Sequence, residues 1–201
     1  MNQKAARYHL ERVLSGELQL SANNAFYDQS YKALIELGAN VCGNGDGLDV
    51  LALAHAVYGW MPTILKNYEL EVLATMPVAR VKAIKDIGCA IELLDDWLPS
   101  RPPINNSWVG TSKMLHFLNP EVFAIWDRRV AGRFEMKAYS LHRNRKHYLE
   151  YLKFCHEFMK AKASDLDHYR VAHMPNVSRL RALELIMFLT TSPDSPSVRS
   201  F

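Results

Sequence analysis

The chain has 201 residues, of which 49% are apolar and 22% are charged, and its formal net charge is +3 with a pI near 8.7. This composition supports one compact domain with a hydrophobic core and excludes a chain that is disordered throughout. The mild positive charge permits nucleic-acid binding without requiring it.

The cysteines and apolar runs exclude several classes of protein. Cys42, Cys89 and Cys155 are far apart, and no CxxC pair or Cys/His cluster occurs. The sequence therefore predicts neither a disulfide framework nor a zinc site, and it lacks the four thiolates of an iron–sulfur cluster. The first residues lack the apolar core of a signal peptide, and no apolar run approaches the roughly 20 residues of a membrane span. We expect a cytoplasmic protein with no metal and no cofactor.

Apolar residues recur with helical period along almost the whole chain, so we expect an all-α fold of some eight to ten helices. Ser21 and Asp46 are candidate helix caps, and Thr75 with Pro77 is a start signal for a long helix. The predicted helices cover residues 3–14, 21–38, 48–58, 78–98, 145–162 and 177–189, with a further start at Thr63 and a frayed tail from 192 to 201.

Prolines at positions 99, 102 and 103 predict an extended connector and the clearest internal boundary. We therefore predict a single domain, residues 1–201, with two helical lobes of about 1–100 and 101–201. After the connector, a helix is predicted to start at about Gly110 and to break at Asn119-Pro120. The run 122–126 could be a strand by propensity, but it is short and has no partner.

Asp127 follows that apolar run directly and precedes another predicted helix. The ordinary role for an aspartate there is to cap the helix that follows. Two features favour a catalytic role: Arg128 and Arg129 follow at once, and the segment beginning at Gly110 would lie close by. The two roles are compatible because backbone N–H groups at a helix start stabilise a negative charge.

Positive charge is concentrated around this aspartate. Residues 101–147 contain nine Lys or Arg and three Asp or Glu, a net charge of +6, so the remaining residues carry −3. A positive face made by one segment is typical of proteins that bind a phosphate backbone. A solvated helical surface is the alternative interpretation. The basic run 141–147 reads as surface, and Arg179 and Arg181 read as secondary DNA contacts.

The pattern over residues 105–134 resembles the helix-hairpin-helix DNA glycosylases. That family has a glycine hairpin, a helix, an apolar run with a proline, and an aspartate in a V-D-x-x-V-x-R-like context. The corresponding residues here are Gly110-Thr-Ser-Lys113, Pro120, and the run 124–134, in which Asp127 and Val130 match and Arg133 lies one position beyond the arginine of the pattern. Only one hairpin glycine is present and arginines follow the aspartate, so we interpret the chain as a divergent member.

The resemblance implies two helical lobes with a helix-hairpin-helix element between them, and duplex DNA as the partner of a monomeric enzyme. The hairpin residues Gly110, Thr111 and Ser112 would present N–H groups to a phosphate. Arg128, Arg129 and Arg133 would hold the flanking backbone. The target nucleotide would be flipped into a pocket, where Asp127 would stabilise the oxocarbenium-like sugar or orient the attacking water.

Other residues have two interpretations each. Trp126, Trp60 and Trp108 are candidates to stack on the base or fill the gap that it leaves, and simple core packing is the alternative. Lys113 either contacts a phosphate, which we expect of a monofunctional enzyme, or forms a Schiff base that leads to strand cleavage. His116 is expected to be a buried, hydrogen-bonded histidine.

The predicted function is hydrolysis of the N-glycosidic bond of a damaged or modified base, which leaves an abasic site. Repair of oxidised or alkylated bases and defence against phage with modified bases are both open. The main alternative is a non-catalytic helical DNA-binding protein on the same scaffold, against which the retained Asp127 argues. A helical interaction protein without DNA is a third possibility, which the +6 segment disfavours.

Overall fold

The computed structural model describes residues 1–20, 25–61, 64–98, 101–136 and 144–190, without the side chains of residues 25–28. Within those ranges the chain forms eleven α-helices and no β-strand, so the predicted all-α class is confirmed. Among the helices of these ranges, none combines the length and the apolar character needed to cross a membrane.

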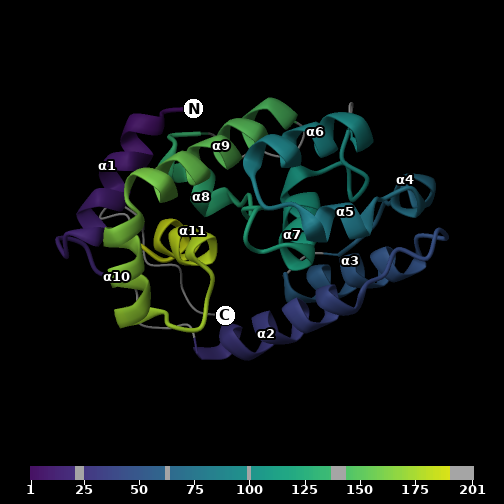
Figure 1. Cartoon of the computed structure of the whole chain (residues 1–201), viewed down its shortest axis with the longest axis horizontal. Helices are drawn as coiled ribbons and strands as arrows, with labels where there is room; N and C mark the ends of the chain where they lie inside the picture. The colour runs from purple at the N-terminus through teal and green to yellow at the C-terminus, as the bar shows by residue number, and fades with distance from the viewer. Residues whose placement is uncertain (21–24, 62–63, 99–100, 137–143, 191–201) are drawn as a thin grey trace.

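The helices gather into two groups, one at each side of the molecule (Figure 1). The first group consists of α2 (Ala25–Asn40), α3 (Leu48–Trp60), α4 (Leu70–Ala74), α5 (Val78–Ala83) and α7 (Trp108–Leu118). The second consists of α1 (Gln3–Leu14), α8 (Arg128–Arg133), α9 (Arg145–Ala161), α10 (Ala163–His173) and α11 (Arg179–Leu189). The remaining helix, α6 (Ile87–Trp97), contacts α9.

The N-terminal helix belongs to the second group, which differs from the predicted division near residue 100. Helix α1 has the predicted bounds and buries Ala6, Leu10 and Val13. It contacts α8, α10 and α11, and the Asn2 N–H donates to the Phe134 carbonyl at 3.1 Å. An amphipathic first helix finds its apolar partners in the C-terminal half, which periodicity alone does not reveal.

The predicted long helix over residues 78–98 is wrong, because the chain breaks between α5 and α6. Ile84 has extended backbone angles, and the Asp86 side chain caps α6 by accepting from the Cys89 N–H at 2.9 Å. The Asn119 side chain donates to the carbonyls of Val81 and Ile84 at 2.8 and 3.0 Å. These long-range bonds satisfy the end of α5 and stabilise the break.

Several other boundaries agree with the sequence. Helix α7 ends at Asn119 as predicted, Asp46 accepts from the first N–H of α3, and Ser178 caps α11. The short α4 and the whole of α10 were not predicted. The expectations for Ser21, Thr63, Pro99, most of the basic run 141–147 and the tail 192–201 lie outside the described residues.

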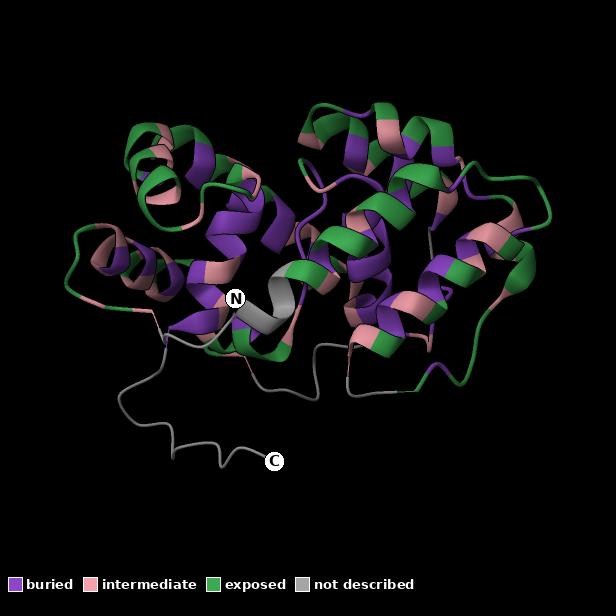
Figure 2. Cartoon of the chain, turned by 90° about the horizontal axis from the view of Figure 1, so that it is seen from below, coloured by how far each residue is buried: buried purple, intermediate pink, exposed green. Residues whose placement is uncertain are grey.

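Helix α7 is the most deeply buried helix near the middle of the molecule. All of its residues except Val109 are buried, and it contacts α2, α3 and α5. Figure 2 shows the buried residues concentrated in the inner helices and the exposed ones on the outer surfaces. Because α7 is enclosed in this way, polar side chains on it can act only within the protein or toward an internal cleft.

Candidate active site

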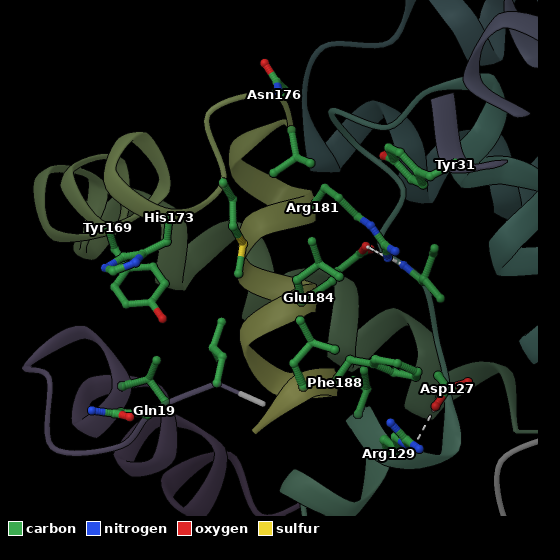
Figure 3. Close-up of a pocket in the computed structure, with 18 of the residues that line it drawn as sticks. Gln19, Tyr31, Asp127, Arg129, Tyr169, His173, Asn176, Arg181, Glu184 and Phe188 are labelled. Atoms are coloured by element: carbon green, nitrogen blue, oxygen red, sulfur yellow. Dashed lines mark hydrogen bonds and ion pairs between the residues drawn. The ribbon is translucent and has the colours of Figure 1, made fainter. Parts of the chain in front are cut away.

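A cleft of about 1100 Å³ lies between the two groups of helices, and we call it the central cleft. It is lined by residues from α1, α2, α3, α7, α8, α10 and α11 and from the segments that follow α1 and precede α8. The polar or aromatic residues of interest in it are Tyr31, Trp60, Lys113, Asp127, Arg181 and Glu184. Figure 3 shows Arg181 and Glu184 projecting from α11 on the side of Tyr31 and Asp127.

Lys113 and Asp127 meet in this cleft. The Lys113 Nζ lies 3.5 Å from the Asp127 Oδ2, 2.8 Å from the Met61 Sδ and 5.9 Å from the centre of the Trp60 ring. Lys113 is only 7% exposed. Burial lowers the pKa of Lys113, and the neighbouring Asp127 carboxylate opposes that shift only in part. The site therefore holds an amine that is easier to deprotonate than an ordinary lysine.

Asp127 is held by a helix start and by α7. Its Oδ1 accepts from the Arg129 N–H at 2.8 Å, so the predicted capping role is confirmed. The preceding residue is fixed as well, because the Trp126 N–H donates to the Ser112 Oγ at 2.9 Å. With Oδ1 engaged in the cap, Oδ2 is the oxygen that faces Lys113. Capping and a role in the cleft coexist in one carboxylate.

The chain before Asp127 is buried and has no regular secondary structure, and side chains form hydrogen bonds with its backbone groups. His116 on α7 lies 2.8 Å from the Phe123 carbonyl through Nδ1 and 2.8 Å from the Tyr31 hydroxyl through Nε2. A carbonyl only accepts, so Nδ1 carries the proton and Nε2 accepts from Tyr31. Burial lowers the pKa of His116 to about 3, so the ring is neutral near pH 7. The expected buried, hydrogen-bonded histidine is confirmed.

Arg181 and Glu184 form a buried pair on α11 that the sequence did not assign to the site. The Arg181 Nη1 donates to the Glu184 Oε2 at 3.0 Å, and the Glu184 Oε1 accepts from the Ile125 N–H. Burial raises the pKa of Glu184 to about 7, although Arg181 and the Ile125 N–H oppose the shift. The signal in the sequence is an Arg and a Glu three positions apart in an otherwise apolar helix.

The predicted phosphate-binding hairpin is corrected by the burial of its residues. Gly110, Thr111 and Ser112 lie buried within α7 rather than at an exposed turn. A Cβ on Gly110 would lie 2.2 Å from the Tyr58 hydroxyl, so the glycine permits close helix packing. In this position the three residues cannot present their N–H groups to DNA.

The turn that leads into α7 lies five residues earlier than predicted. Asn105 and Asn106 have φ values of +49° and +48°, and Ser107 caps the helix. The Asn105 side chain accepts from the N–H groups of Lys66 and Asn67, at 2.9 Å each. Asparagine tolerates this left-handed conformation, so an Asn-Asn pair was the available signal.

The tryptophans separate into two groups. Trp126 and Trp108 are fully buried and pack against Tyr151 and Tyr148, with ring centres 4.9 and 5.1 Å apart. The candidate stacking role of these two is therefore corrected to core packing, since they do not reach the cleft. Trp60 lines the cleft and is the one of the three whose position suits stacking on a base.

The three arginines after Asp127 also differ. Arg128 and Arg129 are exposed at the cleft, and Arg129 lies over the Phe188 ring at 4.7 Å. Arg133 is partly buried and donates to the carbonyls of Met187, at 2.9 Å, and Thr190. Those carbonyls end α11, so the predicted DNA contact at Arg133 is corrected to a helix C-terminal bond.

Comparisons of the chain with protein-family models, curated proteins and solved structures found no match. Among the described residues, no three His, Cys, Asp or Glu side chains are grouped to hold a metal ion.

Proposed function

We propose that this chain is a DNA glycosylase in which Lys113 and Asp127 act on the sugar of a nucleotide held in the central cleft. The observation that carries the proposal is the contact of a buried amine and a helix-capping carboxylate at 3.5 Å in that cleft. A residue whose pKa is shifted by burial and that lies beside a charged partner in a cleft, as Lys113 does, is typical of catalytic sites. The resemblance of residues 105–134 to helix-hairpin-helix glycosylases points to the same two residues.

The proposed reaction uses the lowered pKa of Lys113. Its neutral amine attacks the sugar C1′ with its lone pair, and the electron pair of the glycosidic bond leaves with the base. The proton released from the nitrogen passes to Asp127, whose carboxylate also stabilises positive charge on the sugar as the bond breaks. Ring opening transfers the proton from Asp127 to the sugar O4′ and gives a protonated Schiff base, while the expelled base anion takes a proton from water. Asp127 then accepts the C2′ proton as the C3′–O bond breaks, and the 3′ phosphate leaves with that electron pair, which cleaves the strand.

This mechanism revises the expected role of Lys113. A phosphate contact requires an exposed ammonium group, whereas Lys113 is buried beside Trp60 and Met61. Burial favours the neutral amine that a nucleophile needs. We therefore favour a bifunctional enzyme over the monofunctional one that the sequence suggested, in which water would attack the sugar with Asp127 alone assisting.

Duplex DNA would be held by the exposed cations at the cleft. Arg128 and Arg129 lie directly beside Asp127 and are placed to contact phosphates that flank a flipped nucleotide. A residue such as Trp60 can stack on the extruded base. The second candidate, a helical DNA-binding protein without catalysis, is disfavoured because a binder gains nothing from an amine and a carboxylate enclosed behind its cationic surface.

The test is incubation of the chain with duplexes that carry single oxidised, alkylated or bulky modified bases, followed by detection of abasic sites and strand breaks. Wild type is expected to act on at least one of them, and Asp127→Asn should abolish excision while retaining DNA binding. Asp96→Asn is the matched control, since Asp96 is exposed and pairs with Arg80 away from the cleft. Full activity of Asp127→Asn would refute the mechanism.

A further inference from the structure

We propose that Arg181 reads the extruded base, so that the cleft accepts neutral bases with an exocyclic oxygen and rejects positively charged alkylated bases. This inference rests on the proposed function and names the substrate class of the same site. It concerns a residue that neither attacks the sugar nor holds the DNA backbone. Its support comes from the surroundings of the Arg181 guanidinium, its unused donors and its place relative to Lys113.

The Arg181 side chain forms part of the cleft wall with almost its whole length enclosed. It is 8% exposed, and its guanidinium carbon lies 4.7 Å from the centre of the Tyr31 ring and 5.9 Å from that of Trp60. Figure 3 shows Tyr31 and Arg181 next to each other. Two aromatic rings and the ion pair with Glu184 fix the guanidinium in one orientation, which a recognition group needs.

The guanidinium has more donors than its protein partners use. The Nη1 donates to Glu184, while Nη2 makes no hydrogen bond among the described residues. A buried donor without an acceptor is costly, and native proteins rarely retain one without a reason. A ligand in the cleft that brings a carbonyl oxygen would satisfy this group. Arginine has no acceptor atoms, so it selects for an acceptor on the ligand.

The position of Arg181 relative to the catalytic pair suits a nucleotide. The Lys113 Nζ and the Arg181 guanidinium both lie 5.9 Å from the Trp60 ring centre. Both groups thus lie beside one aromatic ring, so a nucleotide whose sugar lies at Lys113 and Asp127 would have its base within reach of the guanidinium. The flat ring would gain the aromatic surface of Trp60, and its outer edge would reach the guanidinium.

The charges facing the base oppose a cationic ligand. At the inner wall, which the base would reach, the charged groups are Arg181 and Glu184, whereas Asp127 and Lys113, which reacts as a neutral amine, lie at the sugar. Because burial raises the pKa of Glu184 to about 7, part of its negative charge is lost near neutral pH. His116 beside it is neutral. The inner wall is therefore neutral to positive, which repels a base alkylated to a cation and tolerates a neutral base.

A purely structural role for the ion pair does not account for the position of Arg181. Glu184 accepts from Ile125 through Oε1 and would hold the segment before Asp127 without an arginine. Replacing a buried ion pair by apolar residues is often neutral for stability. Retaining a guanidinium on the wall of the cleft thus points to recognition, and excision selectivity is the readout that separates recognition from structure.

The experiment compares single-turnover excision from three duplexes that carry hypoxanthine, 8-oxoguanine or 7-methylguanine at one position. Wild type should excise at least one of the two neutral oxo bases more than tenfold faster than the cationic 7-methylguanine. Loss of a hydrogen bond to a charged group should reduce this ratio about 10- to 100-fold in Arg181→Met. Arg80→Met is the control, because Arg80 is exposed, pairs with Asp96 and lies outside the cleft, so it should leave the ratio unchanged.

A second variant guards against misfolding. Arg181→Met with Glu184→Gln removes both charges and retains an oxygen for the Ile125 N–H, and it should show the same loss of selectivity. Borohydride trapping on a duplex with an abasic site, which has no base to read, tests the catalytic pair separately. Suppose that wild type is trapped on the abasic duplex. The inference alone is then overturned by any of three results: a preference for 7-methylguanine, no excision of any of the three bases, or an unchanged ratio in both variants. If wild type shows no excision and no trapping, the proposed function is overturned as well.

Discussion

Replacing Lys113 by methionine should stabilise the fold while removing activity. Lys113 is 7% exposed, and burial lowers its pKa. The charged form of Lys113 is therefore less favourable in the folded chain than in the unfolded chain. Methionine has a similar length and is expected to fit between Met61 and Trp60. Asp127 keeps its bond to Arg129, and its side chain is 18% exposed, so its charge is not stranded.

The magnitude follows from these contacts. Exchanging both partners of a buried ion pair for apolar residues stabilises proteins by about 1–4 kcal/mol, whereas removing one partner costs about 3–5 kcal/mol when the other charge is left fully buried. Asp127 is partly exposed and keeps its bond to Arg129, so we expect a gain at the low end of the first range, near about 1 kcal/mol. For a chain of this length that corresponds to a rise in Tm of roughly 2–4 °C. Urea unfolding at pH 7 measures it. Lys146→Met is the control, since that side chain is 82% exposed and its loss should change stability by less than about 0.5 kcal/mol.

The pH dependence has a definite sign. Between its lowered folded pKa and its usual value of 10.5, the unfolded chain binds more protons at Lys113 than the folded chain does. Wild-type stability from this group therefore rises with pH through that window, and the advantage of the methionine variant shrinks. A destabilisation of about 2 kcal/mol or more in Lys113→Met would refute the reasoning, because the ammonium would then be a stabilising structural partner of Asp127.

Three further predictions follow from other contacts. Arg128→Ala should weaken DNA binding and reduce the slope of log Kd against log salt by about 1, measured by fluorescence anisotropy; an unchanged slope would place Arg128 away from phosphate. Gly110→Ala should destabilise the chain by about 1–3 kcal/mol in urea unfolding, because its Cβ would lie 2.2 Å from the Tyr58 hydroxyl. The control is Gly132→Ala, whose Cβ would meet nothing within 4 Å and which should be neutral or stabilising by up to about 1 kcal/mol. Equal effects of the two variants would contradict the packing of Gly110 against Tyr58. Burial raises the pKa of Glu184 from 4.5 to about 7, so the folded chain binds more protons at Glu184 than the unfolded chain does between these pH values. Wild type therefore loses about 3 kcal/mol of stability from this group as the pH rises from 4.5 to 7. Glu184→Gln should gain stability relative to wild type over the same range, and a constant difference between the two would show that the pKa is not raised.

Local patterns in the sequence were sufficient to predict most helices and the position of Asp127. Helical periodicity located α1 to the residue, and the Asn119-Pro120 break was visible because both residues end helices. The position of Asp127 directly before α8 also predicted its capping role. Each of these features depends on neighbours close in the chain, which a single sequence contains.

The errors arose where distant residues decide the structure. The break between α5 and α6 depends on the Asn119 side chain, more than thirty positions away. Gly110 looked like a turn because its true role, contact with Tyr58, is a tertiary one. Arg133 looked available for DNA because its partner carbonyls lie at the end of α11. Tertiary packing determines such roles, and spacing along the chain does not encode it.

The candidate site was predicted in part. Lys113 and Asp127 were both named from the sequence, but only the fold brings them to 3.5 Å and buries the amine. The spacing of Arg181 and Glu184 on α11 indicates a local ion pair, but such pairs usually lie at the surface, so the burial of Glu184 in the cleft was not predictable. The contact of Glu184 with Ile125 explains its burial. Trp60 could not be separated from Trp108 and Trp126 by residue type.

The most direct test of the central claim is borohydride trapping of the covalent intermediate. Purified chain is incubated with a duplex that contains an abasic site, the imine is reduced, and the linked peptide is mapped by mass spectrometry. A covalent adduct on Lys113 in wild type, absent from Lys113→Met and present in Lys146→Met, is the predicted result. No adduct in wild type, or an adduct that persists in Lys113→Met, would contradict the proposed role of the Lys113–Asp127 pair.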